Sequence, residues 1–118
     1  MVREADDRDR LEVALVENLV REDLNPIDVA QACAALLEDF GQTQTELAGR
    51  LGRSRPALSN LLRLLELPDD VQELVADGAL SEGHGRAVLM ADGARRRRAL
   101  ARRAVDEGLS VRQVEALA

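Results

Sequence analysis

The sequence predicts an all-α domain built from several short helices. No stretch alternates apolar and polar residues as a strand does over a useful length. Helical spacing of apolar residues instead recurs between turn signals along most of the 118 residues. Only Phe40 is aromatic, so aliphatic side chains must form the core. A chain of this length can bury one helical core but not a large catalytic cleft.

Two helices are expected in the first third of the chain. The first spans about residues 7–21, and its candidate core positions are Leu11, Ala14, Leu15, Asn18 and Leu19. Asn25 is the expected N-cap of the second, with Pro26 in the first helical position, where both residue types are favoured. This helix should end near Phe40, and its expected buried stripe is Ile27, Ala30, Ala34 and Leu37.

Residues 43–67 have the pattern of a helix-turn-helix. Thr43 and Glu46 form a capping-box pattern at the start of its first helix, and Gly52 is expected to end that helix. After a short turn, Ser54 is the expected N-cap of the second helix, with Pro56 in its first turn. The predicted core stripe of this second helix is Leu58, Leu61, Leu62 and Leu65.

Four further helices are expected in the remainder of the chain. They cover about residues 69–77, 81–90, 94–107 and 110–118. Ser81 and Ser110 are typical N-caps, whereas Gly78 and Gly108 are typical of helix C-termini. The sequence therefore predicts a multi-helix domain around one helix-turn-helix.

Charge is unevenly distributed along the chain. The formal net charge is -6, and residues 1–40 hold eleven acids and four arginines. Residues 41–65 hold four arginines and a single acid, Glu46, so the helix-turn-helix is locally basic. Contacts to phosphates require such local positive charge. A single aromatic residue argues against a binder of single-stranded nucleic acid, which stacks bases on several aromatic rings.

We predict that the second helix of the helix-turn-helix reads duplex DNA in the major groove. The side chains on its outer face can donate to and accept from base edges and phosphates; they are Arg55, Ser59, Asn60 and Arg63. Further DNA contacts are expected from neighbouring positions, namely Thr43, Gln44, Arg53, Ser54, Gly83, His84 and Arg86.

Other functional classes have little support in the sequence. His84 is the only histidine, and no nucleophile with a base and no complete phosphate loop occurs, so no enzyme is predicted. The acids near the start fit no metal-ligand spacing and are interpreted as a solvated face. The arginines at 95–98, 102 and 103 fit a nucleic-acid patch and a solvated helix face equally well. No signal peptide or membrane-spanning segment is predicted, which indicates a cytoplasmic, nucleoid-associated protein.

Four segments in order resemble the central DNA-binding domain of ParB-type chromosome and plasmid partition proteins. They are ENLVREDLNPIDVAQA, TQTELAGRLGRSRPALSNLLRLLELP, LVADGALSEGHGRAVL and EGLSVRQVEAL, and together they cover nearly the whole chain. The resemblance implies binding of the centromere-like parS site, an inverted repeat, by paired copies, and a ParA-type ATPase as partner. We therefore expect residues 1–22 to be the last helix of a truncated N-terminal nucleotide-binding domain and residues 23–118 to be the helix-turn-helix DNA-binding domain.

The resemblance also assigns roles to individual residues. Arg55 matches the family's parS-reading arginine. Gly83 matches the residue found at this position in the ParB branch, where the related Noc branch has a basic residue. Full-length relatives bind CTP with Mg²⁺, and the family's ENxxR segment of that pocket corresponds to Glu17, Asn18 and Arg21. The phosphate-binding segment expected upstream is absent from this sequence. The fragment is therefore expected to bind no cofactor and to have no enzymatic activity.

Two alternatives remain open on the sequence alone. Leu61 and Glu66 match neither the ParB branch nor the related Noc branch, which keeps open a Noc-like or KorB-like regulator of a different palindrome. The other alternative is a helical protein-interaction module that docks a partner through its acidic N-terminal half. In that case, removing the arginines of the recognition face would leave function intact.

Overall fold

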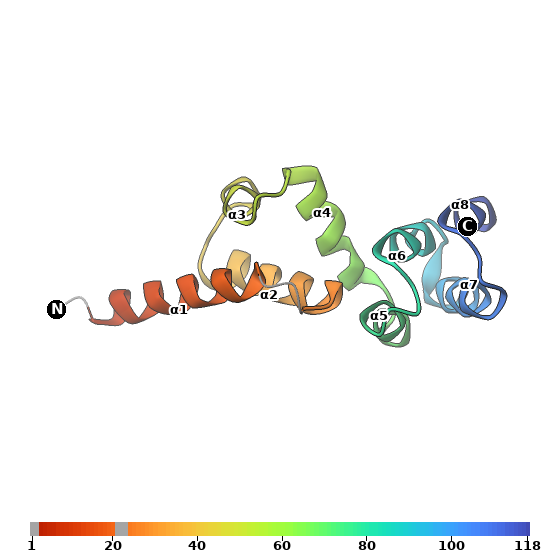
Figure 1. Ribbon diagram of the computed structural model, residues 1–118, viewed down its shortest axis with the longest axis horizontal. Coiled ribbons are helices and arrows are strands. Elements are labelled where there is room, and N and C mark those ends of the chain that lie inside the picture. The colour runs from red at the N-terminus through yellow and green to blue at the C-terminus, as the bar shows by residue number, and fades with distance from the viewer. Residues whose placement is uncertain (1–2, 21–23) are drawn as a thin grey trace.

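The computed structural model describes residues 3–20 and 24–118, with side chains described from residue 7 onward, and it contains helices and no strand in these ranges. The elements are α1 (Arg3–Leu19), α2 (Pro26–Asp39), α3 (Gln44–Leu51), α4 (Arg55–Arg63), the 3₁₀ turn η1 (Leu64–Glu66), α5 (Asp69–Ala76), α6 (Glu82–Leu89), α7 (Gly93–Glu107) and α8 (Val111–Leu117). In Figure 1, α1 and α2 lie along one edge, α3 and α4 lie above them, and α5 to α8 gather at the other end. The prediction of an all-α fold is confirmed.

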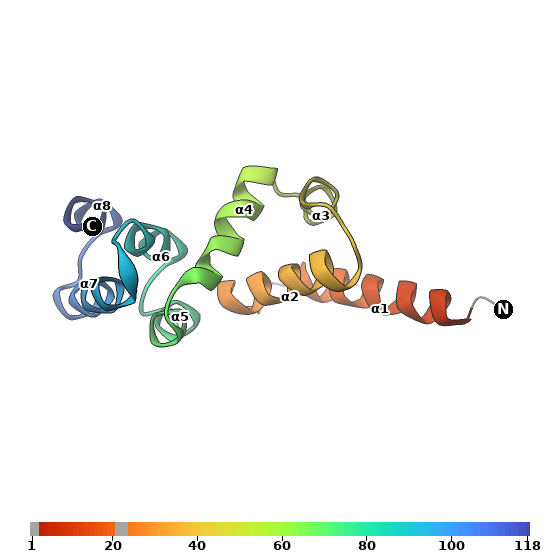
Figure 2. The same ribbon diagram turned by 180° about the vertical axis from the view of Figure 1, so that it is seen from behind.

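The helices join into an elongated molecule with one continuous core. Its principal extents are 58 × 24 × 23 Å, and Figure 2 shows α1 projecting from one end and α7 and α8 at the other. The buried apolar residues form a single cluster that runs from Leu19 to Val114. This shared core fixes the helix-turn-helix relative to the C-terminal helices.

Helix α2 lies at the centre of the first half of the fold. It contacts α1, α3, α4, η1 and α5, so more than one of its faces is covered. The prediction of Ile27 and Ala30 as buried residues is confirmed, but Ala34 and Leu37 are only half-buried. The additional buried positions are Val29, Cys33 and Leu36. A pattern that assumes one buried stripe predicts too few buried residues for a helix that is covered on several sides.

Helix α1 differs from the prediction in its bounds and in its packing. It begins at Arg3 and ends at Leu19, and of the five expected core residues only Leu19 is buried. Leu11 is 55% exposed, in an open hollow that it lines together with Leu15 and with Asp39 and Phe40 at the end of α2. Polar contacts hold its middle: Glu12 pairs with Arg50 of α3 at 3.5 Å and accepts a hydrogen bond from Gln42.

The predicted helix ends are confirmed at most positions. Five N-cap side chains accept a hydrogen bond from a backbone N–H three residues later, and they belong to Asn25, Thr43, Ser54, Ser81 and Ser110. Gly52 and Gly108 end α3 and α7 in the left-handed conformation, with φ of 68° and 63°. Only glycine adopts that backbone conformation readily, which is why it ends helices.

Candidate DNA-binding surface

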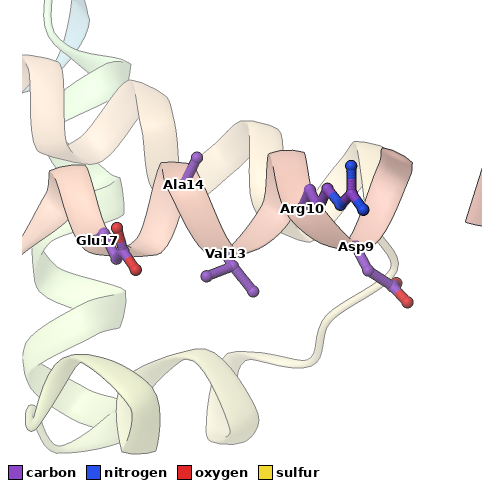
Figure 3. Close-up of a pocket in the computed structure, with 5 residues that line it drawn as sticks. All are labelled: Asp9, Arg10, Val13, Ala14 and Glu17. Atoms are coloured by element: carbon purple, nitrogen blue, oxygen red, sulfur yellow. The ribbon is translucent and has the colours of Figure 1, made fainter. Parts of the chain in front are cut away.

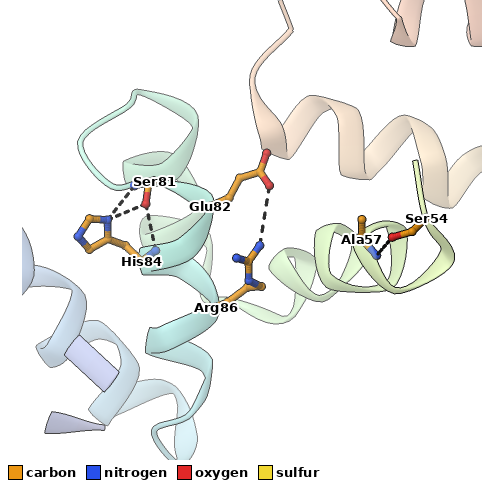
Figure 4. Close-up of polar contacts among 6 residues, drawn as sticks. All are labelled: Ser54, Ala57, Ser81, Glu82, His84 and Arg86. Carbon is orange, nitrogen blue, oxygen red and sulfur yellow. Dashed lines mark hydrogen bonds and ion pairs between the residues drawn. The ribbon is translucent and has the colours of Figure 1, made fainter. Parts of the chain in front are cut away.

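The turn between α3 and α4 is closed by local hydrogen bonds. The backbone N–H of Arg53 donates to the carbonyl of Ala48 at 2.9 Å, which satisfies a free carbonyl at the end of α3. Ser54 Oγ then accepts from the backbone N–H of Ala57 at 3.2 Å and caps α4 (Figure 4). The N-terminus of α4 is thereby held at a fixed angle to α3.

The buried side of α4 has a different phase from the predicted one. Leu58 and Leu61 are fully buried as expected, but Leu62 and Leu65 are half-buried and Leu64 takes the third core position. The chain tightens into η1 after α4, and with three residues per turn Leu64 stays on the same side as Leu61.

The outer side of α4 carries the predicted polar residues. Arg55 is the first residue of the helix and is exposed, Ser59 and Asn60 are half-buried, and Arg63 is exposed in the last turn. No acidic residue occurs in the first turn of α4. The N-terminal end of this helix therefore combines a guanidinium group with the positive end of the helix dipole.

A hydrogen bond links the two helices across this surface. Ser59 Oγ donates to Gln44 Oε1 at 2.7 Å, so two predicted DNA-binding side chains from α3 and α4 are in direct contact. Gln44 is the first residue of α3, immediately after the N-cap Thr43. The structure thus brings the start of α3 and the middle of α4 together.

The capping box of α3 is complete and affects the ionisation of its glutamate. Glu46 N–H donates to Thr43 Oγ1, and the Glu46 carboxylate accepts from Thr43 N–H, both at 3.1 Å. The backbone N–H of Thr43 and, to a smaller degree, the Thr43 side chain stabilise the charged carboxylate and so lower the pKa of Glu46. Because the folded-state pKa is lowered, the stabilisation is present at neutral pH and is lost as pH falls through that folded pKa.

A Glu46→Gln variant should therefore flatten the acid side of the stability profile. Glutamine can keep the capping box but does not titrate. We expect the melting temperature of the wild type to fall faster than that of the variant between about pH 5 and pH 3, the range in which a glutamate carboxyl titrates. Thermal unfolding followed by circular dichroism at a series of pH values measures this. Parallel curves for the two proteins would contradict it.

The two glycines of α6 lie close to apolar side chains of other elements. A Cβ atom on Gly85 would lie 2.8 Å from Leu64 Cδ2, and one on Gly83 would lie 3.2 Å from Val111 Cγ2. Gly85 is buried, and its lack of a side chain lets Leu64 of η1 approach α6 closely. Gly83 is half-buried, and its contact with DNA stays a prediction.

The side chain of His84 connects two segments of the domain. Its Nδ1 accepts the backbone N–H of Ser81 at 3.2 Å, and its Nε2 lies 2.7 Å from the carbonyl oxygen of Leu109. Both ring nitrogens therefore have partners within the domain, and the ring links the start of α6 to the loop before α8. A contact of this ring with DNA stays a prediction, and it would require one of these partners to be exchanged.

Arg86 leaves α6 on the opposite side from His84 (Figure 4). It forms an i,i+4 ion pair with Glu82 at 4.0 Å, and both side chains are more than one third exposed. Exposed pairs of this kind are weak, so the guanidinium can exchange partners at low cost.

Of the three residues expected to belong to a nucleotide pocket, the structure describes two. Glu17 and Asn18 are exposed on α1, and Arg21 lies outside the described residues. A hollow of about 380 Å³ along α1 is lined by residues of this one helix, among which Glu17 is the only member of the expected set (Figure 3). A triphosphate site needs several convergent backbone amides and cations, and a single helix face does not provide them.

Metal-binding clusters and membrane-spanning helices are both absent from the described residues. No group of three or more His, Cys, Asp or Glu side chains there could hold a metal ion. None of the helices in the described ranges combines the length and apolar character that crossing a membrane requires.

Comparison with known families identifies this arrangement. The family model described as the ParB HTH domain matches residues 22–118. This chain belongs to the ParB family. It is 47% identical over 117 residues to stage 0 sporulation protein J of Bacillus subtilis and 49% identical over 120 residues to the probable chromosome-partitioning protein ParB of Xylella fastidiosa strain 9a5c.

The relatives are considerably longer than this chain. The first alignment covers 99% of the chain and 42% of the Bacillus protein, and the second covers 98% of the chain and 37% of the Xylella protein. The chain thus spans about two fifths of the length of these ParB relatives. The helix-turn-helix domain accounts for most of what is shared.

Solved ParB structures show the same fold. The C-terminally truncated ParB of Caulobacter crescentus complexed to the centromeric parS site is 42% identical, with a TM-score of 0.84 over 92% of this chain and 56% of that chain. A ParB DNA-binding domain complexed to parS gives a TM-score of 0.80 over 92% of this chain and 87% of its own length. The Caulobacter protein complexed with CTP-gamma-S gives 0.55 over 79% of this chain and 50% of its own. The present arrangement of helices is therefore closer to that of the parS complexes.

Proposed function

We propose that this chain binds the parS site of chromosome or plasmid partition systems in a sequence-specific manner, with α4 in the major groove. The observation that carries the proposal is the exposed N-terminal end of α4, which presents Arg55 from a capped and packed helix. The similarity to ParB domains solved in complex with parS supports it. Recognition helices of helix-turn-helix proteins contact base edges with their N-terminal residues.

The proposed contacts divide into two kinds. Base readout is assigned to the outer side of α4, that is, to Arg55, Ser59, Asn60 and Arg63. Phosphate contacts are assigned to the start of α3, the turn and α6, that is, to Thr43, Gln44, Arg53, Ser54, Gly83, His84 and Arg86. Phosphate contacts fix the register on the duplex and base contacts specify the sequence.

The proposal extends to the number of copies on the site, the partner protein and the domain boundaries. Two copies would pair on the inverted repeat, and the full-length protein would act with a ParA-type ATPase at the nucleoid. Residues 1–22 would be the last helix of the nucleotide-binding domain and residues 23–118 the DNA-binding domain, a division supported by the family match to residues 22–118.

A salt series with two duplexes tests the proposed function. We expect tighter binding to parS than to a scrambled duplex of the same composition at every salt concentration. Affinity for both should fall by about 0.9 log units per log unit of salt for each phosphate neutralised. Fluorescence anisotropy with labelled duplexes measures both quantities. Equal affinity for the two duplexes would contradict parS recognition, and a salt-independent affinity would favour the protein-docking alternative.

This chain is also expected to bind parS without CTP and to show no saturable CTP binding of its own. The reason is that Glu17 and Asn18 stand on an exposed helix face and do not surround a phosphate. Calorimetric titration with CTP and Mg²⁺, with and without the parS duplex, checks this. Saturable binding in the micromolar range would show that the remaining segment suffices.

A further inference from the structure

Helix α7 carries a concentration of positive charge that the proposed function does not use. Six of its fifteen residues are arginine, and its two acids, Asp106 and Glu107, stand at its C-terminal end. The chain as a whole has a net charge of -6. This helix is therefore a basic surface on an acidic protein.

Three of the six arginines have partners within the domain. Arg97 donates to the carbonyls of Leu89 and Ala91, both at 2.9 Å, and so caps the C-terminal end of α6. Arg98 pairs with Asp70 at 3.1 Å, and Arg103 pairs with Glu107 at 2.7 Å. The contacts of Arg97 and Arg98 link α7 to α6 and α5, whereas the Arg103–Glu107 pair lies within α7.

The other three arginines, Arg95, Arg96 and Arg102, make up the basic face of α7. All three are exposed, and none makes a hydrogen bond or ion pair with another described residue. Arg95 and Arg102 are seven residues apart and lie on the same side of the helix, with the small exposed Ala99 between them. A small residue at that point lets an extended, charged backbone come close to both guanidinium groups.

The helix that presents this face is firmly packed. Leu100, Ala101 and Ala104 are buried on its inner side, where α7 contacts α5, α6 and α8. The arginines therefore stand on a fixed support. Preorganised guanidinium groups suit phosphates, which they can bind with two parallel hydrogen bonds.

The basic face of α7 lies away from the recognition helix. Figures 1 and 4 both place α6 between α4 and α7. Helix α6 contacts both α4 and α7, so the recognition helix and α7 belong to separate parts of the surface.

We propose that Arg95, Arg96 and Arg102 bind the phosphate backbone of a second segment of duplex DNA, without reading its sequence. The face lacks the apolar anchors of a protein interface: along α7, which the structure describes throughout, Val105 is the only exposed large apolar side chain. Arginines grouped around a small residue instead fit a phosphate backbone. One domain would then hold two DNA segments together, an inference that rests on the proposed function of α4.

A capture experiment tests this directly. A parS duplex with short flanks is immobilised and saturated with the chain, and a labelled free duplex without the site is then added at several salt concentrations. The test variant is Arg95→Gln with Arg102→Gln. The matched control is Arg8→Gln with Arg10→Gln, which removes the same charge from α1 at the opposite end of the molecule.

The wild type and the control should capture the labelled duplex, and the test variant should capture less. Loss of two phosphate contacts should lower the slope of log affinity against log salt by about 2. Retention of all three proteins on immobilised parS shows that the proposed function holds independently of this inference. If all three are retained but none captures the second duplex, or if the control loses capture as much as the test variant, the inference fails.

A second arm separates two sources of phosphate. Here the immobilised parS duplex carries extended flanks and no free duplex is added. One outcome is that the test variant binds this extended duplex less tightly than the control does, while in the first experiment both capture the free duplex equally well. That combination would mean that α7 contacts the flanks of the same DNA, and the proposal of a second segment would be wrong.

Discussion

Replacing Arg55 with alanine is expected to remove most of the preference of this chain for parS over a scrambled duplex. Arg55 is the first residue of the capped helix α4, is exposed, and has no acid beside it in the first turn. A bidentate contact from arginine to guanine contributes about 1 to 3 kcal/mol of discrimination against a wrong base. Two copies on an inverted repeat would lose this contribution twice.

The matched control for this prediction is Arg50→Ala. Arg50 lies at the end of α3, carries the same charge, and pairs with Glu12 at 3.5 Å, away from the face assigned to base readout. Competition binding with parS and scrambled duplexes gives the selectivity of each variant. We expect Arg50→Ala to keep the wild-type ratio. Selectivity that is unchanged in Arg55→Ala, with circular dichroism showing an intact fold, would remove Arg55 from the readout.

The largest expected effect on stability is that of Leu58→Ala. Leu58 is fully buried where α4 packs on α2 and α3, so truncation leaves a cavity in the core of the helix-turn-helix. Changes of this kind cost about 2 to 5 kcal/mol, out of a total of about 5 to 15 kcal/mol for a typical domain. We therefore expect a large fall in the free energy of unfolding, measured by urea denaturation.

Leu62→Ala deletes the same atoms from the next turn of α4, where the side chain is only half-buried. Its cost should be clearly smaller than that of Leu58→Ala, because less apolar surface returns to water. Equal costs for the two variants would mean that the buried side of α4 is wrongly assigned.

The helix ends could be predicted because they depend on local chemistry. The N-cap oxygen of Ser54 and the left-handed backbone of Gly52 act within a few residues, so a short stretch of sequence contains the whole interaction. The candidate surface followed from the same local pattern. Once the turn is fixed, Arg55 must stand at the start of α4.

The remaining differences come from contacts between distant residues. The role of His84 depends on the carbonyl of Leu109, which is 25 positions away, and nothing near His84 in the sequence indicates it. The exposure of Leu11 depends on how little of it the end of α2 covers, which the sequence of α1 does not show. The burial of Gly85 depends on the approach of Leu64, and its sequence signal, a glycine inside a helix, fits close packing as well as contact with DNA.

The most direct test of major-groove reading is chemical protection of parS by the bound chain. Dimethyl sulfate methylates N7 of guanine in the major groove and N3 of adenine in the minor groove, so one reagent reports on both grooves. With α4 in the major groove and Arg55 at a guanine edge, guanine N7 positions within the repeat should be protected and adenine N3 positions should stay reactive. Protection confined to adenine N3, or none at saturating protein, would contradict the assignment of α4 as the recognition helix.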